Sequence, residues 1–216
     1  MAISNYSELQ ASVAGWLNRS DLSVVIPDFI SLAEAQFNRV MRAREMQGQA
    51  TANINTAFFA LPADFAEVKA MRLTDGSGAV WDLIQATPEQ LSTGMAESST
   101  PSVPEFYSIL GEQFQIYPPP NGAYVATLIY VRKLVPLSTA APSNWLLETA
   151  PDIYLYGSLV QAAQYLRDVE GLATWKALLE QAIEELRVGD KPVIGPLRTD
   201  IPLVGLQRRY NIYSDW

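Results

Sequence analysis

The sequence predicts an α+β fold that is mainly helical: a four-helix bundle with an inserted small antiparallel β unit and an extended C-terminal arm. Three observations lead to this prediction. Apolar residues recur with the helical period in four stretches of the chain. Between about residues 48 and 133 the period changes to two, which is typical of strands. After residue 191, prolines and glycines interrupt an apolar sequence, so we expect no regular helix there.

The stretch from Thr149 to Asp168 is predicted to be the central helix. Thr149 has the chemistry of an N-cap, Asp152 can return a bond to the backbone, and Pro151 suits the first turn. Two stripes of apolar residues follow the helical period, one made of Ile153, Tyr156, Val160 and Ala163 and the other of Leu155, Leu159, Ala162 and Leu166. Two stripes indicate a helix that is covered from more than one side. It lies either at the centre of a bundle or at a subunit interface.

Three further helices are predicted, over residues 4–18, from near Pro27 to about Met46, and from about Leu172 to Val188. The last of them carries Glu180 and Glu184 along its outer side. The second carries a polar face opposite its apolar one, formed by Asp28, Glu34, Asn38, Arg42 and Glu45. This face is either solvated or a contact with a neighbouring subunit.

The inserted β unit is predicted from alternating segments separated by turn residues. The segments are residues 50–55, 68–74, 79–83, 105–110, 113–117 and 124–131. Asp75-Gly76-Ser77-Gly78 and Gly111-Glu112 have the chemistry of hairpin turns. Thr87 is predicted to cap a short helix that ends near Met95, and residues 134–148 form a proline-marked connection back to the central helix.

The chain therefore divides into a helical-bundle domain, residues 1–191, which contains the β insertion at about 48–133, and an extended arm, residues 192–216. The arm is rich in Val, Ile, Leu, Tyr and Trp, which is not a disordered composition. An extended apolar terminus needs a surface to lie on. It either wraps its own bundle or lies on another chain, where it can add a strand.

The composition excludes several functional classes. The net charge is -8, and residues 1–186 hold ten Lys and Arg against twenty Asp and Glu, so the body does not bind nucleic acid through its phosphates. Residues 187–216 hold five basic and three acidic residues, a mildly basic balance. No apolar run is long enough to span a bilayer, and the N-terminus lacks the pattern of a signal peptide.

The sequence also predicts no catalytic site, no metal site and no cofactor. It contains neither His nor Cys, so the commonest general base, metal ligand and thiol nucleophile are missing. Two pairs of carboxylates, Asp64 with Glu67 and Glu180 with Glu184, lack the further oxygen ligands of a calcium loop. We interpret them as capping and solvated acids.

Four segments together resemble a known family. They are SDLSVVIPDFISLAEAQFNRVMRAREM, ALPADFAEVKAMRL, FYSILGEQFQIYPPPNGAYVATLIYVRKLVPLS and NWLLETAPDIYLYGSLVQAAQYLRD. In this order they cover about residues 4–190 and resemble the head-to-tail adaptor, or connector, proteins of tailed bacteriophages. The segment after residue 195 has no firm match.

The resemblance implies a structural, non-enzymatic virion protein, made in the host bacterial cytoplasm and located at the neck of the particle. Family members form a homo-oligomeric ring, expected to be a dodecamer, beneath the portal protein. The ring extends the DNA channel, lets DNA pass without specific binding, and offers a platform to tail or nozzle proteins. Acidic walls suit this role because they repel phosphates, and Glu180 and Glu184 are the candidate channel-facing residues.

The resemblance also implies that the C-terminal arm docks on the portal. Its Arg, Tyr and Trp residues are of the types that dominate interface energetics, and they are Arg198, Arg208, Arg209, Tyr210, Tyr213 and Trp216. The alternatives are a small phage hydrolase or nucleic-acid-processing factor, and a free cytosolic binding module. A tight divalent-cation site would favour the first of these, and absence of the chain from purified virions would favour the second.

Overall fold

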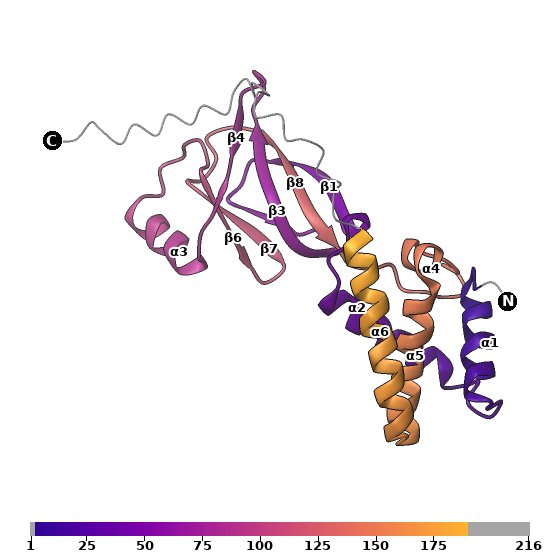
Figure 1. The fold of residues 1–216 in the computed structure, drawn as a ribbon. Coiled ribbons are helices and arrows are strands. Elements are labelled where there is room, and N and C mark those ends of the chain that lie inside the picture. The colour runs from indigo at the N-terminus through magenta and orange to yellow at the C-terminus, as the bar shows by residue number, and fades with distance from the viewer. Residues whose placement is uncertain (1–2, 190–216) are drawn as a thin grey trace.

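The computed structural model of the chain describes residues 3–189, and the predicted arm lies outside these residues. Two parts are visible, a group of helices at one end and two β-sheets at the other (Figure 1). The helices are α1 (Tyr6–Leu17), α2 (Ile26–Val40), α3 (Pro88–Glu97), α4 (Trp145–Thr149), α5 (Pro151–Leu166) and α6 (Val169–Gly189), with a 3₁₀ turn at Arg44–Met46. The strands are β1 (Gln47–Ile54), β2 (Phe58–Ala60), β3 (Phe65–Thr74), β4 (Val80–Asp82), β5 (Ile84–Gln85), β6 (Phe106–Leu110), β7 (Gln113–Tyr117) and β8 (Tyr124–Arg132).

The predicted fold class, a mainly helical four-helix bundle, is wrong. Residues 3–189 contain six α-helices and two sheets of four strands each. The β region is too large to be a small insert because it builds a core of its own, separate from the core of the helices. The unit is also not purely antiparallel, since β5 pairs with β6 in parallel. Helix α3 contacts β6 and β7 and belongs to this β part.

Helix α5 lies at the centre of the helical part, as its two apolar stripes predict. It contacts α1, α2, α4 and α6. Nine of its residues are buried, among them Gly157, Leu159 and Ala163. Gly157 allows the closest approach, because a Cβ built there would lie only 2.5 Å from Cζ of Phe37 on α2. Within the single chain α5 is therefore a central, covered helix and not an exposed one.

Two helix boundaries differ from the prediction. Thr149 ends α4 instead of capping α5, whose N-cap is Ala150, and Asn144 provides the side-chain cap one helix earlier. Helix α2 ends at Val40 and not at Met46. From Met41 the chain is extended, so that successive side chains point to opposite sides. The apolar side chains of Met41 and Ala43 are buried, and the charged side chains of Arg42 and Arg44 are exposed. A continued helix would not separate these residues in this way.

The two sheets pack face to face. The first has the order β1-β8-β3-β4 and the second β2-β7-β6-β5. Apolar side chains from both line the space between them, with Leu73 and Leu128 from the first sheet and Phe114 and Ile116 from the second. The alternation in the strands places these residues on one face and polar residues on the other.

The predicted turns of the β part are confirmed. Oδ1 of Asp75 accepts bonds from the N–H groups of Ser77 and Ala79, at 2.8 and 2.9 Å, and Gly78 has a φ of 85°. Gly111 joins β6 to β7 with a φ of 61°, which glycine adopts without steric cost. Thr87 forms a capping box with Gln90 at the start of α3.

Candidate assembly surfaces

The polar face predicted on the second helix is divided by the structure between buried and exposed residues. Glu34 is 5% exposed, whereas Asp28 and Arg42 are exposed and Glu45 is partly exposed. Arg42 Nε bonds Glu67 Oε2 on β3 at 2.8 Å, which links the end of α2 to the β part. The guanidinium of Arg132 on β8 donates to the carbonyl of Glu45 at 3.2 Å. Much of this face therefore serves contacts inside the chain.

Glu34 is the centre of a buried polar cluster. Its Oε1 accepts a bond from the N–H of Leu137 at 2.7 Å and another from Oη of Tyr154 at 3.0 Å. Nδ2 of Asn144 donates to Oη of Tyr154 and to the carbonyl of Val135, each at 2.7 Å. All polar side-chain atoms buried in the described part of the chain have partners.

This cluster fixes the connection from β8 to α4 against α2 and α5. Asn38, one turn after Glu34, extends the same contact because its Oδ1 accepts from the N–H of Leu134 at 2.7 Å. Buried backbone N–H groups need such partners, and a loop has no ladder to supply them. Side chains of α2 therefore hold the connection that leaves β8 against the helical part, and Val131 in β8 is buried in the same helical core. The sequence offered a weak signal for this, namely an Asn before the run WLLET that reads as a cap.

Burial raises the pKa of Glu34 above its usual value, although the bonds from Leu137 and Tyr154 oppose the shift. Burial also raises the pKa of Tyr154, so its hydroxyl stays protonated and donates. A raised carboxyl pKa means that the folded chain retains a proton that the unfolded chain has lost. The resulting stability is fully present below the unfolded pKa and is lost as the pH rises through the folded pKa.

We therefore expect Glu34→Gln to gain stability relative to the parent chain as the pH rises. Gln keeps an acceptor oxygen for Leu137 and Tyr154 but cannot ionise. Urea unfolding of both proteins between about pH 4 and pH 8 measures the difference in free energy of unfolding. Glu34→Ala, the control, cannot ionise either but leaves two buried donors without an acceptor, so it should be about 1–3 kcal/mol less stable than Glu34→Gln at every pH. An identical pH dependence for the parent and Glu34→Gln would contradict the assignment.

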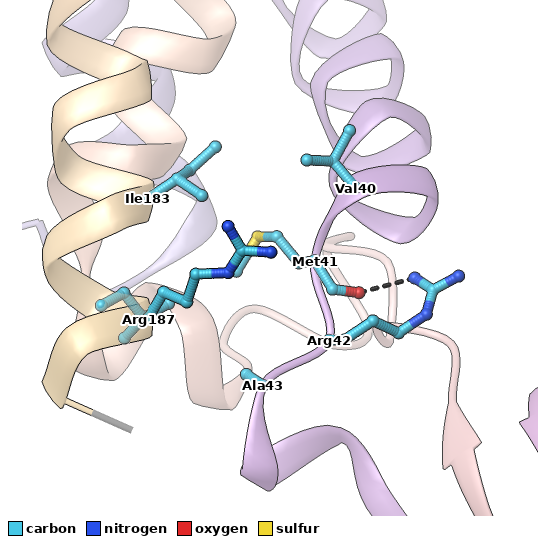
Figure 2. A pocket seen from close by; sticks show the side chains of 7 residues that line it. Val40, Met41, Arg42, Ala43, Ile183 and Arg187 are labelled. Carbon is cyan, nitrogen blue, oxygen red and sulfur yellow. Dashed lines mark hydrogen bonds between the residues drawn. The ribbon is translucent and has the colours of Figure 1, made fainter. Parts of the chain in front are cut away.

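A small apolar cleft lies where α6 ends beside the segment that leaves α2 (Figure 2). Its volume is about 90 Å³, enough for one apolar side chain but far below a cofactor pocket. Met41, Ile183 and Leu186 supply apolar surface, while Arg42 turns its guanidinium back to the carbonyl of Met41 at 2.6 Å. Arg187 flanks the opening and pairs with Glu184 at 3.4 Å.

The outer side of α6 is acidic, as its sequence predicts. Glu180 and Glu184 are exposed, and Lys176 and Arg187 lie along the same helix as partners at 3.9 and 3.4 Å. A second exposed feature is aromatic: Trp16 of α1, 53% exposed, lies with its ring centroid 5.5 Å from that of Trp175 on α6. Tyr156 of α5 stacks on Trp175 behind it.

The predicted arm residues, Arg198, Arg208, Arg209, Tyr210, Tyr213 and Trp216, lie outside the described residues. Within residues 3–189, no three His, Cys, Asp or Glu side chains are grouped so that they could hold a metal ion. The helices described in the same range include none long and apolar enough to cross a membrane.

The surface of residues 3–189 carries a small apolar cleft, an exposed tryptophan and a row of acidic side chains, and none of them identifies a function by itself. Comparison with known families gives the class of protein. The family model for the SU10 adaptor protein matches residues 4–200, so the chain belongs to this family of bacteriophage adaptor proteins. No curated protein matches the chain. Membership places the protein in the virion, among the head and tail proteins that an adaptor contacts.

Proposed function

We propose that the protein forms a ring beneath the portal, extends the DNA channel and provides the attachment platform for tail proteins. The observation that carries this proposal is the family match, which spans nearly the whole described chain and runs to residue 200. The role is structural and needs no catalysis. The described chain has a helical part and a β part, and Glu34 and Asn38 fix the connection that leaves β8, which suits a subunit that contacts a head protein and a tail protein.

Within the ring, the acidic side of α6 is the candidate channel wall. Glu180 and Glu184 are exposed, and the whole chain carries a net charge of -8. A wall of this sign repels DNA phosphates and lets the duplex slide without binding. Contacts between neighbouring subunits are proposed at the members of the predicted polar face that reach solvent, Asp28 on α2 and Arg42 and Glu45 beyond its end. Glu34 and Asn38 contribute indirectly, because they bond the backbone of Leu137 and Leu134 and so fix the connection between β8 and α4 beside this face.

The arm, residues 192–216, is proposed to dock on the portal. It continues from α6, whose last described residue is Gly189. It combines Arg, Tyr and Trp with three prolines. A fully extended chain of this length could span about 80 Å, at about 3.3 Å per residue.

Deleting residues 196–216 should give a folded protein that no longer joins portal-containing particles. No described residue is removed, so the circular dichroism spectrum and the melting temperature should stay near those of the parent. The measurement is the amount of the protein in purified particles, set against the amount of portal. A matched variant keeps the length but carries Arg208→Ala, Arg209→Ala and Trp216→Ala, and it should also lose most incorporation if these side chains carry the contact.

Normal incorporation of the truncated protein would overturn the docking role. A reconstruction of the particle neck by electron microscopy tests the ring itself. The expected density is a closed ring between portal and tail, and a neck without such a ring of this chain would overturn the proposed function.

A further inference from the structure

Strand β1 has a free edge that the rest of the described chain leaves uncovered. In its sheet β1 pairs only with β8, and no other strand within residues 3–189 lies along its second side. Its eight residues, QGQATANI, contain no charge and no proline. Exposed edge strands usually carry such residues to prevent pairing with another chain. An unguarded edge of this length is a template for an added strand.

The hydrogen bonds of β3 show which of its backbone groups face each neighbour. The N–H of Leu83 donates to the carbonyl of Met71 at 3.0 Å, and the N–H of Asp75 donates to the carbonyl of Ala79 at 3.1 Å. The backbone N–H and C=O groups of the odd-numbered residues in this part of β3 therefore point toward β4. In an antiparallel sheet the intervening residues bond the opposite neighbour, so Arg72 faces β8.

The register then carries this pattern across the sheet to β1. Arg72 is opposite Thr127 of β8, so the backbone groups of Thr127 bond β3. The backbone groups of the preceding residue, Ala126, therefore bond β1. Ala126 is opposite Ala52, which leaves Thr51 with its N–H and C=O directed at the free edge. The same holds for every odd-numbered residue of β1. Their side chains are exposed as well, and they are Gln47, Gln49, Thr51 and Asn53.

The opposite edge of the same sheet is β4, along whose second side no strand of the described residues lies. By the same pattern Val80 and Asp82 direct their backbone groups away from β3, and the side chain of Val80 is 58% exposed. Figure 1 shows β4 and β1 on either side of β3 and β8. All three pairings in this sheet are antiparallel, so β1 and β4 run in opposite directions.

We propose that the free edge of β1 in one copy pairs with the β4 edge of a second copy, so that the sheets of neighbouring subunits join. Each copy offers one edge of each kind, and a contact between two different surfaces repeats around a closed ring. Rotation about an axis near the strand direction keeps β1 and the incoming β4 antiparallel. Thr51 and Val80 then lie on the same, outward face of the joined sheet, because Val80 shares the face of Thr74 and Arg72. The inference rests on the ring proposed above and names its subunit contact.

Cysteine cross-linking tests this contact directly, because the chain contains no native cysteine. Within one copy β1 and β4 are separated by two strands, about 14 Å, which is beyond the reach of a disulfide. The double variant Thr51→Cys with Val80→Cys, oxidised mildly in assembled particles, should therefore give a ladder of linked multimers on a non-reducing gel. Particles that contain a mixture of the two single variants should give dimers only.

The single variants distinguish other occupants of the edge. Thr51→Cys alone should give no linked product. A dimer from it would show that two β1 strands pair about a two-fold axis, and this would overturn the proposal. No linked product from the double variant in particles that contain the ring would overturn the β1–β4 contact and leave the proposed function standing. Particles whose necks contain no ring of this chain would overturn both.

Discussion

Gly157→Val should unfold the helical part at temperatures well below those the parent tolerates. Even a single Cβ at position 157 would lie 2.5 Å from Cζ of Phe37 and 3.3 Å from Cβ of Ala33. The Phe37 ring has no room to turn aside, since it is 1% exposed and packs edge-on against Tyr154 with centroids 5.5 Å apart. Overpacking of this kind costs about 1–3 kcal/mol, and the three carbons of Val put the expected loss at the upper end or beyond. Thermal unfolding followed at 222 nm measures it.

The control is Gly15→Val on α1. Gly15 is also helical, but a Cβ there meets no atom within 4 Å. Val is the better helix former of the two by a few tenths of a kcal/mol, so this variant should be neutral or slightly more stable. Phe37→Leu should restore part of the stability of Gly157→Ala, because the shorter side chain vacates the contact. If Gly157→Val and Gly15→Val behave alike, α5 and α2 are not in the close contact described.

The position of α5 could be predicted because its evidence is local. Two apolar stripes on one helix require cover on two sides, and α5 is covered by four helices. The hairpin turn at Asp75 and the cap at Thr87 were predictable for the same reason, since the side chain and the backbone groups that it binds are a few residues apart. Local chemistry of this kind is visible in sequence alone.

Glu34 shows where local evidence fails. Its position opposite the apolar stripe of α2 indicated either a solvated face or a contact with a neighbouring subunit, yet the side chain is buried within its own chain. The cover comes from Leu137, more than a hundred positions away in the chain, which no periodicity in α2 reveals. The predicted end of α2 was wrong for a different reason. Met41 and Ala43 satisfy a helical pattern as apolar residues near its end, and only the inward and outward alternation in the structure shows that the backbone is extended.

The size of the β part was underestimated for a related reason. Most of the strands were recognisable singly, but their pairing is non-local: β1 pairs with β8, about eighty residues later, and β2 pairs with β7. A count of hairpins therefore predicts a small meander, whereas the strands sort into two sheets with a core between them. The edge of β1 could not be predicted either, because a strand is known to be an edge only when the order of its sheet is known.

Phe114→Ala should destabilise the β part selectively. Phe114 is fully buried between the two sheets and lies 5.1 Å from Phe59, 5.7 Å from Phe65 and 6.1 Å from Tyr107, measured between ring centroids. Removing such a ring takes away a large buried area and leaves a cavity among rings that cannot all move to fill it. The expected loss is about 3–5 kcal/mol in the free energy of unfolding. Phe58→Ala is the matched control, since Phe58 lies on the neighbouring strand but is 43% exposed, and its loss should stay below about 1 kcal/mol.

Where this destabilisation appears depends on how the two parts are coupled. Their buried clusters are separate, but Val131 of β8 is buried in the helical cluster and Ala66 of β3 packs against it, beside the polar contacts of Glu34, Asn38 and Arg42. Phe114 belongs to the other cluster, so its loss should first open the strands that pack around it. Hydrogen exchange of Phe114→Ala should therefore accelerate at the backbone amides of β6 and β7 while α5 keeps the protection it has in the parent. Equal acceleration in α5 would show that the two parts unfold as one unit, coupled through Val131, Ala66 and these polar contacts.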